Sequence, residues 1–201
     1  MFDDVVEWVS EASDIALDAE LRAIEARRRE DAAREAALLA EIERREIFRH
    51  DEHATMWGLL RSRLHWSDGE CRTGMRLARL VADHPEVGES LFEAWMSLAN
   101  ANELARAAVR VGLDEHDDPA AHREFGELGR LAQQLEHADL RVHVREWEQR
   151  VARREATAVA EDTHEQRSAQ VRVDAEGGEI VATFGALDAA EMSEILSLIH
   201  I

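Results

Sequence analysis

The densest group of possible metal ligands in the sequence is the run "HDEH", residues 50–53. Two histidines at i and i+3 can share a helix face and bind a metal ion, with Asp51 or Glu52 as an oxygen ligand. Structural zinc normally takes four protein ligands, and nothing else at ligand spacing completes this set. The alternative is a solvated polar linker between two helices. We favour the linker and expect no cofactor in this segment.

The only cysteine, Cys71, lies one turn into a helix that Ser67 is expected to cap. A thiol near a helix N-terminus can have a lowered pKa. The local sequence places no His or Asn to make it a nucleophile, although partners could come from elsewhere in the fold. We therefore expect a small, semi-buried residue. The chain has no P-loop, Gly-rich dinucleotide turn, Gly-x-Ser-x-Gly elbow or His-Glu-x-x-His motif, so its sequence carries no catalytic signature.

Arginine supplies all 24 basic residues, and two groups of arginines could contact phosphate. The group at 27–29 is offset by nearby Glu and Asp, which favours a solvated helix face. The second group is less diluted by acidic residues and follows the helix that contains Trp147. A local basic stripe is what a protein that binds the DNA backbone needs, even when its net charge is adverse. The candidate DNA-contact residues are therefore Arg141, Arg145, Arg150, Arg153 and Arg154.

Three helices expected between Ser67 and Gly112 resemble a helix-turn-helix arrangement. The third helix would then project side chains that can read base edges, namely Asn100, Asn102, Arg106 and Arg110. However, residues 67–111 hold seven acidic residues against five arginines. Ordinary helical packing is therefore the stronger interpretation of this stretch.

Composition limits the classes of protein to consider. The chain has 201 residues, of which 45% are hydrophobic, so it can bury a real core. Its net charge of -19 repels phosphate on average, and any nucleic-acid contact must come from a local basic face. No apolar run approaches the ~20 residues of a membrane helix, and no signal peptide is recognisable. We expect a cytoplasmic protein without a membrane partner. The use of Arg without any Lys is a bias expected from a GC-rich genome, because Arg codons are GC-rich, and we therefore expect a bacterial origin.

The N-terminal quarter has the pattern of long helices. Val5, Val6 and Val9 form a short apolar face, and a helix-compatible stretch then runs from Ile15 to about Phe48. Its middle, "ARRREDAAREAA", carries opposite charges four residues apart, which stabilise an exposed helix. We expect residues 1–53 to form a long helical arm, either protruding or paired in a coiled coil, through which a homodimer could form.

Residues 54–161 are expected to form a helical bundle. The motif "SDGE" puts Ser67 and Glu70 at the spacing of a capping box, so a helix should run from Asp68 to about Ala82. Asp83, His84 and Pro85 should end that helix and start the next. Further helices are marked by the Ser97 cap with Gly112 at its end, by Phe125, Leu128, Leu131, Ala132 and Leu135, and by Leu140, Val144, Trp147 and Val151.

After Glu161 the apolar residues recur at every second position. The stretch "QVRVDAEGGEIVATF" alternates, turns at 176–178 and alternates again, which predicts a β-hairpin in the segment 162–195. Asp188 then offers an N-cap for a further helix that has only started. The predicted fold is therefore mainly α: a multi-helix bundle with a long N-terminal helical arm and a C-terminal β-hairpin.

Two stretches resemble a known family. "SDGECRTGMRLARLVADHPEVGESLFEAWMSLANANELARAAV" is similar to its Ser-x-x-Glu start, its Arg-Leu-Ala-Arg-Leu helix, its Pro and its Leu- and Ala-rich helices. "EQRSAQVRVDAEGGEIVATFGALDAAE" is similar to its Arg-led hairpin and Leu-Asp helix start. The chain thus resembles the bacterial family called domain of unknown function 222, the N-terminal region of HNH-endonuclease-like proteins. It departs from the family at Ala94, where Gly is common, and at Asn100-Ala101, where His-Ala is common.

The resemblance implies a helical module that precedes a separate nuclease domain. An HNH motif is a ββα metal finger with a His general base, and this chain has no such segment after its hairpin. Catalytic residues and a divalent metal are therefore expected only in a missing domain beyond Ile201. Two functions stay open: a DNA-positioning or dimerisation module for that nuclease, or a helical, coiled-coil protein-interaction module without a DNA role.

The last six residues, "LSLIHI" at 196–201, carry no charge in a chain that is 33% charged. They could continue the helix that Asp188 caps. The codons CTG TCT CTT ATA CAC ATC, which match an adapter used in transposase-based DNA library preparation, also translate to these residues. We therefore expect an adapter-derived artefact at 196–201 and a native sequence that ends at about Ile195, so that the chain is a truncated fragment.

Overall fold

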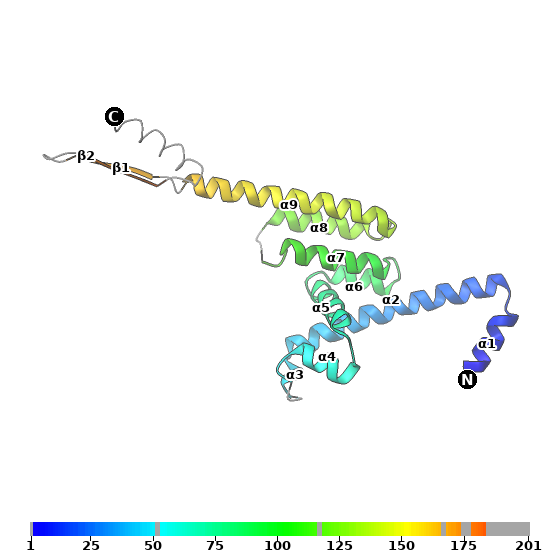
Figure 1. The fold of residues 1–201 in the computed structure, drawn as a ribbon. Coiled ribbons are helices and arrows are strands. Elements are labelled where there is room, and N and C mark those ends of the chain that lie inside the picture. The colour runs from blue at the N-terminus through cyan, green and yellow to red at the C-terminus, as the bar shows by residue number, and fades with distance from the viewer. Residues whose placement is uncertain (1, 51–52, 116–117, 166–167, 174–177, 184–201) are drawn as a thin grey trace. The chain divides into compact units, whose positions relative to one another are not determined.

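The computed structural model describes residues 2–50, 53–115, 118–165, 168–173 and 178–183, and from residue 159 on it describes the backbone alone. Within these ranges nine helices precede two strands, which confirms the mainly α fold (Figure 1). The helix start predicted at Asp188 and the six residues 196–201 lie outside the described residues. None of the described helices has both the length and the apolar character needed to cross a membrane.

The chain divides into two compact units, residues 1–148 and 149–201. The boundary falls inside the last helix, α9 (His137–Glu165), and not in a loop. Each unit is therefore described by itself, and the side chains discussed below as a site all belong to the first unit.

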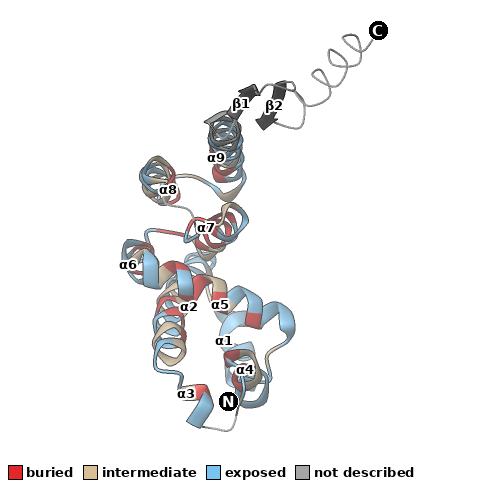
Figure 2. Ribbon diagram, turned by 90° about the vertical axis from the view of Figure 1, so that its left-hand side faces the viewer, coloured by how far each residue is buried: buried red, intermediate tan, exposed pale blue. Residues whose placement is uncertain are grey.

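The first two helices are α1 (Phe2–Glu11) and α2 (Asp14–Arg44). Ser13 caps α2, and its hydroxyl accepts from the Ala16 amide at 3.3 Å. Every described residue of α1 is exposed, whereas the second half of α2 buries Ala33, Ala36 and Leu39 (Figure 2). Where the sequence predicts an arm over residues 1–53, the structure thus packs the second half of α2 against α5 and α6.

One apolar cluster joins the end of α2 to α3 (Ile47–His50), α4 (Met56–Leu64) and α5 (Asp68–Asp83). Apolar side chains drive this packing because their removal from water is favourable at about 25 cal/mol per Å². The buried members are Leu39, Phe48, Met56, Leu59, Leu60, Cys71, Met75 and Ala78. Trp57 and Trp66 pack against the same cluster and stay partly exposed.

The start of α5 confirms the predicted capping box. The Ser67 hydroxyl accepts from the Glu70 amide at 3.3 Å, while the Glu70 carboxylate accepts from the Ser67 amide at 2.7 Å. The Ser67 hydroxyl also donates to the Glu70 carboxylate at 2.7 Å, and this hydrogen bond, together with that from the Ser67 amide, favours the ionised form and lowers the pKa of Glu70. Pro85 begins α6 (Pro85–Phe92), also as predicted.

The remaining helices of the bundle are α7 (Leu98–Val111), α8 (Pro119–Leu131) and the first part of α9. Ser97 caps α7, and Gly112 ends it with a φ of 64°, a conformation that favours glycine. The Phe125 ring lies 5.3 Å from the Trp147 ring, and both side chains are fully buried. The predicted buried face of α9 is confirmed, because Leu140, Val144, Trp147 and Val151 are all buried.

Helix α8 is shorter than the sequence suggests. It ends at Leu131, so Ala132 and Leu135 lie in the turn that leads to α9. The Asn100 side chain explains this turn, since its Nδ2 atom donates to the carbonyls of Ala132 at 2.8 Å and Leu135 at 2.9 Å. A buried amide on α7 therefore satisfies two carbonyls that a continued helix would have used.

In the second unit, strand β1 (Ser168–Val173) pairs antiparallel with β2 (Gly178–Thr183), with Val171 opposite Ile180. The connection at 174–177 lies outside the described residues. The turn that the sequence places there is untested, and the C-terminal β-hairpin stays a prediction.

The turn between α6 and α7 contains a residue in the left-handed region. Ala94 has a φ of 58°, and its carbonyl accepts from Arg29 Nη1 of α2 at 3.1 Å. A Cβ atom in this conformation costs roughly 1–2 kcal/mol, whereas glycine adopts it freely. The position at which the resembled family commonly has Gly is therefore one where the backbone favours Gly.

We predict that Ala94→Gly raises the free energy of unfolding by about 0.5–1 kcal/mol, because the relief of this strain exceeds the added entropy of the unfolded chain. The midpoint of urea unfolding measures the change. Ala37→Gly at an exposed helical position of α2 is the matched control and should lower the free energy by about 1 kcal/mol. Equal effects at both positions would contradict the interpretation.

Candidate functional site

Three arginines lie along one side of α5. Arg72, Arg76 and Arg79 are spaced at i, i+4 and i+7, which places them in a row on a helix of 3.6 residues per turn. The neighbouring side of α5 is occupied by Cys71, Met75 and Ala78 of the core, so the arginines are turned toward solvent. Arg72 and Arg79 are exposed and Arg76 is partly buried.

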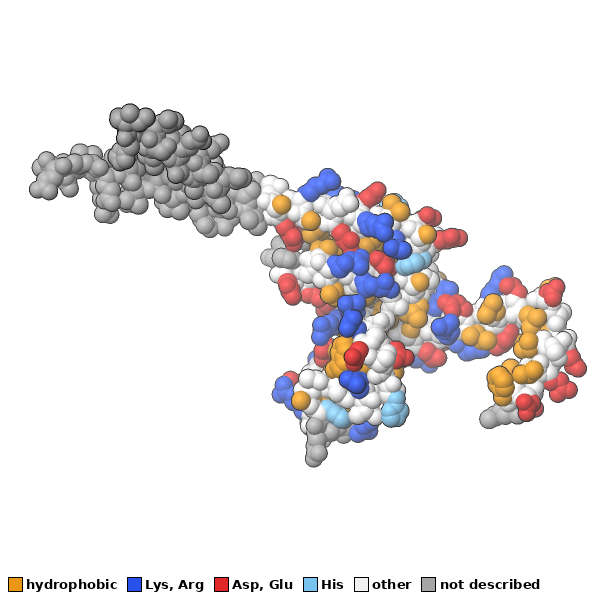
Figure 3. Space-filling view, in the orientation of Figure 1, with side chains coloured by type: hydrophobic (Ala, Val, Ile, Leu, Met, Phe, Trp, Pro, Cys, Tyr) orange, Lys and Arg blue, Asp and Glu red, His pale blue; other side chains and the backbone are white. Residues whose placement is uncertain are grey.

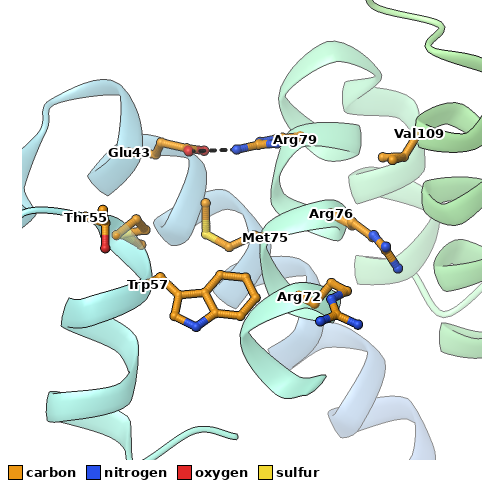
Figure 4. Close-up of a pocket in the computed structure, with 9 residues that line it drawn as sticks. Glu43, Thr55, Trp57, Arg72, Met75, Arg76, Arg79 and Val109 are labelled. Carbon is orange, nitrogen blue, oxygen red and sulfur yellow. Dashed lines mark hydrogen bonds and ion pairs between the residues drawn. The ribbon is translucent and has the colours of Figure 1, made fainter. Parts of the chain in front are cut away.

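The row borders a groove of about 300 Å³ (Figure 4). Its lining comes from the end of α2, the start of α4, the side of α5 and one residue of α7. The lining residues are Glu43, Thr55, Met56, Trp57, Arg72, Met75, Arg76, Arg79 and Val109. An apolar floor and a cationic edge thus meet at one place.

Two interactions fix the groove. Trp57 Nε1 donates to the Asp68 carboxylate at 3.2 Å, which orients the indole. Arg79 donates to the Glu43 carboxylate at 3.2 Å, and this pair appears as the dashed line in Figure 4. Glu43 is the one carboxylate among the described residues that line the groove, and Arg79 offsets its charge.

The basic surface continues from the groove onto α7. Val109 lines the groove, and Arg106 and Arg110 lie beside it, three residues before and one residue after. Both arginines pair with Glu103, at 3.5 Å from Arg106 and at 3.1 Å from Arg110. Arg110 also pairs with Glu148 of α9 at 2.6 Å. This ion pair joins the α7 arginines to α9.

On α9, Arg141 and Arg145 precede Glu148 by seven and three residues, so they lie on the side of the helix that Glu148 occupies. Arginine side chains accordingly gather in a band over α5, α7 and α9 (Figure 3). We call this band the arginine face; its members are Arg72, Arg76, Arg79, Arg106, Arg110, Arg141 and Arg145.

Four of these seven arginines have no acidic partner among the described residues: Arg72, Arg76, Arg141 and Arg145. Arginines of α2, by contrast, are neutralised locally. On the exposed half of α2, for example, Arg22 pairs with Asp18 at 2.9 Å, and Arg27 with Glu20 at 2.9 Å. The arginine face is therefore a region of uncompensated positive charge in an acidic protein.

The structure places only two of the five predicted DNA-contact residues on this face, Arg141 and Arg145. Arg150, Arg153 and Arg154 belong to the second unit, where Arg150 and Arg153 are exposed and Arg154 is partly buried. Whether any of the five contacts DNA stays a prediction. The α5 arginines were not predicted, although their i, i+4, i+7 spacing in "CRTGMRLAR" was a usable signal.

Base reading by the third helix of the stretch 67–112 is not supported. Asn100 is buried, with both Nδ2 hydrogen bonds used on carbonyls of the turn before α9. The Asn102 side-chain oxygen is also buried, without a partner among the described residues. Of that set Arg106 and Arg110 are exposed, and Asn102 is partly buried. Packing is therefore the role of the two asparagines.

The "HDEH" run is only partly described, because Asp51 and Glu52 lie outside the described residues. His50 ends α3 and is exposed, and His53 Nε2 lies 3.0 Å from the Ser62 hydroxyl. Among the described residues no group of three or more His, Cys, Asp or Glu side chains could hold a metal ion.

Cys71 is completely buried in the α2–α5 cluster and not semi-buried as predicted. Burial raises the pKa of the thiol, and the charge of Asp68 adds to the effect. The proximity to the helix N-terminus therefore does not lower it, because desolvation of the thiolate prevails. The thiol is a packing group of the core.

We predict that Cys71 resists alkylation by iodoacetamide at neutral pH in the native protein and reacts fully in denaturant, since the reactive species is the exposed thiolate. Mass spectrometry of the intact chain measures the adduct. Equal rates of alkylation in the native and the denatured protein would contradict the burial of this thiol.

No protein-family model matches the chain, and neither a curated protein nor a solved structure matches it. The resemblance to the domain of unknown function 222 family therefore stays a prediction, and the site has to be interpreted from its own geometry.

Proposed function

We propose that this chain is a DNA-positioning module that holds the phosphate backbone on its arginine face. The observation that carries the proposal is the set of four arginines that have no acidic partner among the described residues, gathered on one face of a chain whose net charge is -19. Guanidinium groups suit phosphate because they donate in a planar fork and stay charged at all physiological pH values.

Local charge decides such contacts. At physiological ionic strength the Debye length is about 8 Å, so the acidic residues on other elements are largely screened from a phosphate at the face. Release of condensed counterions then favours binding for each phosphate that an arginine neutralises. The protein offers sites for at least four such contacts.

The proposal agrees with the family resemblance, under which the catalytic partner that the module positions is an HNH-type nuclease. The chain itself contributes no catalytic group to this proposal. Its part is to bind and orient the substrate backbone, as phosphate contacts set register without reading sequence.

A second candidate function is self-association through the N-terminal helices. Phe2, Val5, Val6 and Val9 of α1 are between 46% and 78% exposed, and Ile15 and Leu21 of α2 are 83% and 67% exposed. Figure 3 shows apolar side chains gathered where these two helices meet. Contiguous apolar surface of this kind commonly marks an interface. A homodimer contact here suits either the nuclease-associated module or the coiled-coil interaction module.

The first test replaces these four arginines of the face together: Arg72→Gln, Arg76→Gln, Arg141→Gln and Arg145→Gln. We expect much weaker duplex DNA binding at low salt and a slope of log K against log salt that is smaller by roughly 3–4, because each phosphate contact contributes about 0.9. Fluorescence anisotropy with a labelled duplex measures both quantities.

Its matched control removes the same charge from α2 with Arg22→Gln, Arg27→Gln, Arg28→Gln and Arg34→Gln, each of which is ion-paired and exposed. These pairs contribute roughly 0–1 kcal/mol each to stability, so the control should fold. If both variants lose the same affinity, net charge and not the face is responsible. If the unaltered chain binds no DNA at low salt, the proposal is wrong.

The second test measures self-association by sedimentation equilibrium. We expect the double substitution Val6→Ser and Leu21→Ser to weaken a homodimer at least tenfold, because it removes two apolar side chains from the contact. Val142→Ser on α9, 53% exposed, is the control and should leave association unchanged. A monomeric unaltered chain at all accessible concentrations excludes this second function.

A further inference from the structure

The groove beside α5 differs from the rest of the arginine face because it contains an aromatic ring. Trp57 stands in the groove with Met75 above it and Arg72 at its edge (Figure 4). Met56 and Met75 are buried beneath the surface, while Trp57 and Val109 retain exposed surface. The lining therefore offers a flat apolar surface next to the guanidinium groups of Arg72 and Arg76, which have no acidic partner in the described part of the chain.

We propose that this groove binds an unpaired nucleobase, stacked on the Trp57 indole, with the adjoining phosphates held by Arg72 and Arg76. The arginine face then prefers single-stranded DNA to duplex DNA. This inference rests on the proposed function, because the backbone must run along the same face.

Shape and polarity favour a base over phosphate alone. A phosphate ion at Arg72 and Arg76 would leave the apolar surface of Trp57, Met75 and Val109 in water. An aromatic base covers this surface, and stacking on a tryptophan combines with cation contacts in many single-strand binding sites. The groove volume of about 300 Å³ gives room for one ring system of this kind.

The aromatic platform is preorganised. The hydrogen bond from Trp57 Nε1 to Asp68 fixes the indole from the first turn of α5, the helix that carries Arg72 and Arg76. The indole therefore keeps its position beside α5 before a ligand arrives. Binding to such a platform avoids part of the entropy cost of ordering side chains.

The groove carries little information about base identity. Glu43, the carboxylate among the described lining residues, is engaged by Arg79, and the Thr55 hydroxyl accepts from the Gly58 amide at 3.1 Å. Stacking is available to every base because each has a π face. A duplex, by contrast, must extrude a base to reach the indole, at a cost of a few kcal/mol.

The experiment compares three labelled DNA probes by fluorescence anisotropy at low salt, with the full chain: a short oligothymidylate, an abasic oligomer with the same backbone, and a duplex of equal length. We expect the oligothymidylate to bind about tenfold more tightly than the abasic oligomer, because one stacked base contributes 1–3 kcal/mol. The duplex should bind more weakly than the oligothymidylate.

Substitutions of tryptophan locate the effect. Trp57→Leu should abolish the difference between the oligothymidylate and the abasic oligomer, while Trp57→Phe should retain part of it. Trp57→Leu should bind the abasic oligomer as tightly as the unaltered chain does. This result would show that the variant is folded and that its arginines are in place. Trp95→Leu, at a 57% exposed position outside the groove, is the matched control and should behave like the unaltered chain.

The outcomes separate the two ideas. If the unaltered chain binds the abasic oligomer and the oligothymidylate equally, or the duplex most tightly, the groove does not take a base, while the backbone proposal stands. If Trp57→Leu keeps the full preference for bases, the stacking site lies elsewhere and this inference is wrong. If no probe binds at low salt, the proposed function fails first and this inference fails with it.

Discussion

The burial of one side of α5 is the constraint on which the other features depend. This helix packs against α2, α4, α6 and α7, and its contact residues include Cys71 and Ala78, neither of which retains any exposed surface. Small side chains at the contact let the helix axes approach closely, in the way that ridge-and-groove packing requires. Burial of this side fixes the rotation of α5 about its axis, and the arginine row therefore lies at the border of the groove. The other lining residues come from α2, α4 and α7, which pack against α5.

The charge of the chain is organised by the same packing. Arginines on α2 alternate with acidic residues of the same helix, so their charges cancel within a turn or two. On α5, α7 and α9 the acidic residues nearest the band are few: Glu103 pairs with both Arg106 and Arg110, and Glu148 pairs with Arg110. An acidic protein can thus carry a basic surface, because the sign of a surface is set by which helix faces meet and not by composition.

Local signals in the sequence predicted the elements well. The Ser67 and Ser97 caps, the Pro85 start and the Gly112 end are each set by residues within a turn of the boundary, and the structure confirms all four. The end of α8 was missed because its cause is Asn100, which is more than 30 residues away in the sequence. No local pattern reveals that a distant side-chain amide will donate to the carbonyls of a turn.

The candidate site was less accessible to sequence reasoning for a related reason. An unpaired arginine is recognisable only when the surroundings are known, and the groove combines residues from Glu43 to Val109. Within one helix, Arg141 and Arg145 could be singled out because acidic residues are sparse there. The contribution of Trp57 could not, since an indole on an apolar helical stripe looks like any other core residue until its partner Asp68 and its exposed surface are seen.

Helix α2 combines two different environments in one continuous element. Before Ala33 none of its residues is buried, and Arg29, which donates to the Ala94 carbonyl, is the first side chain of α2 that is tied to the turn after α6. Backbone hydrogen bonds on the N-terminal side of Arg29 are supported by little besides helix propensity, whereas those beyond it are held by the core. Stability in a protein is distributed in cooperative segments of this kind. Amide protons in the first half of α2 should therefore exchange with solvent through local opening, and those of the second half only when the bundle as a whole opens. A binding partner that covers the first half would register as slowed exchange there, without any change of fold.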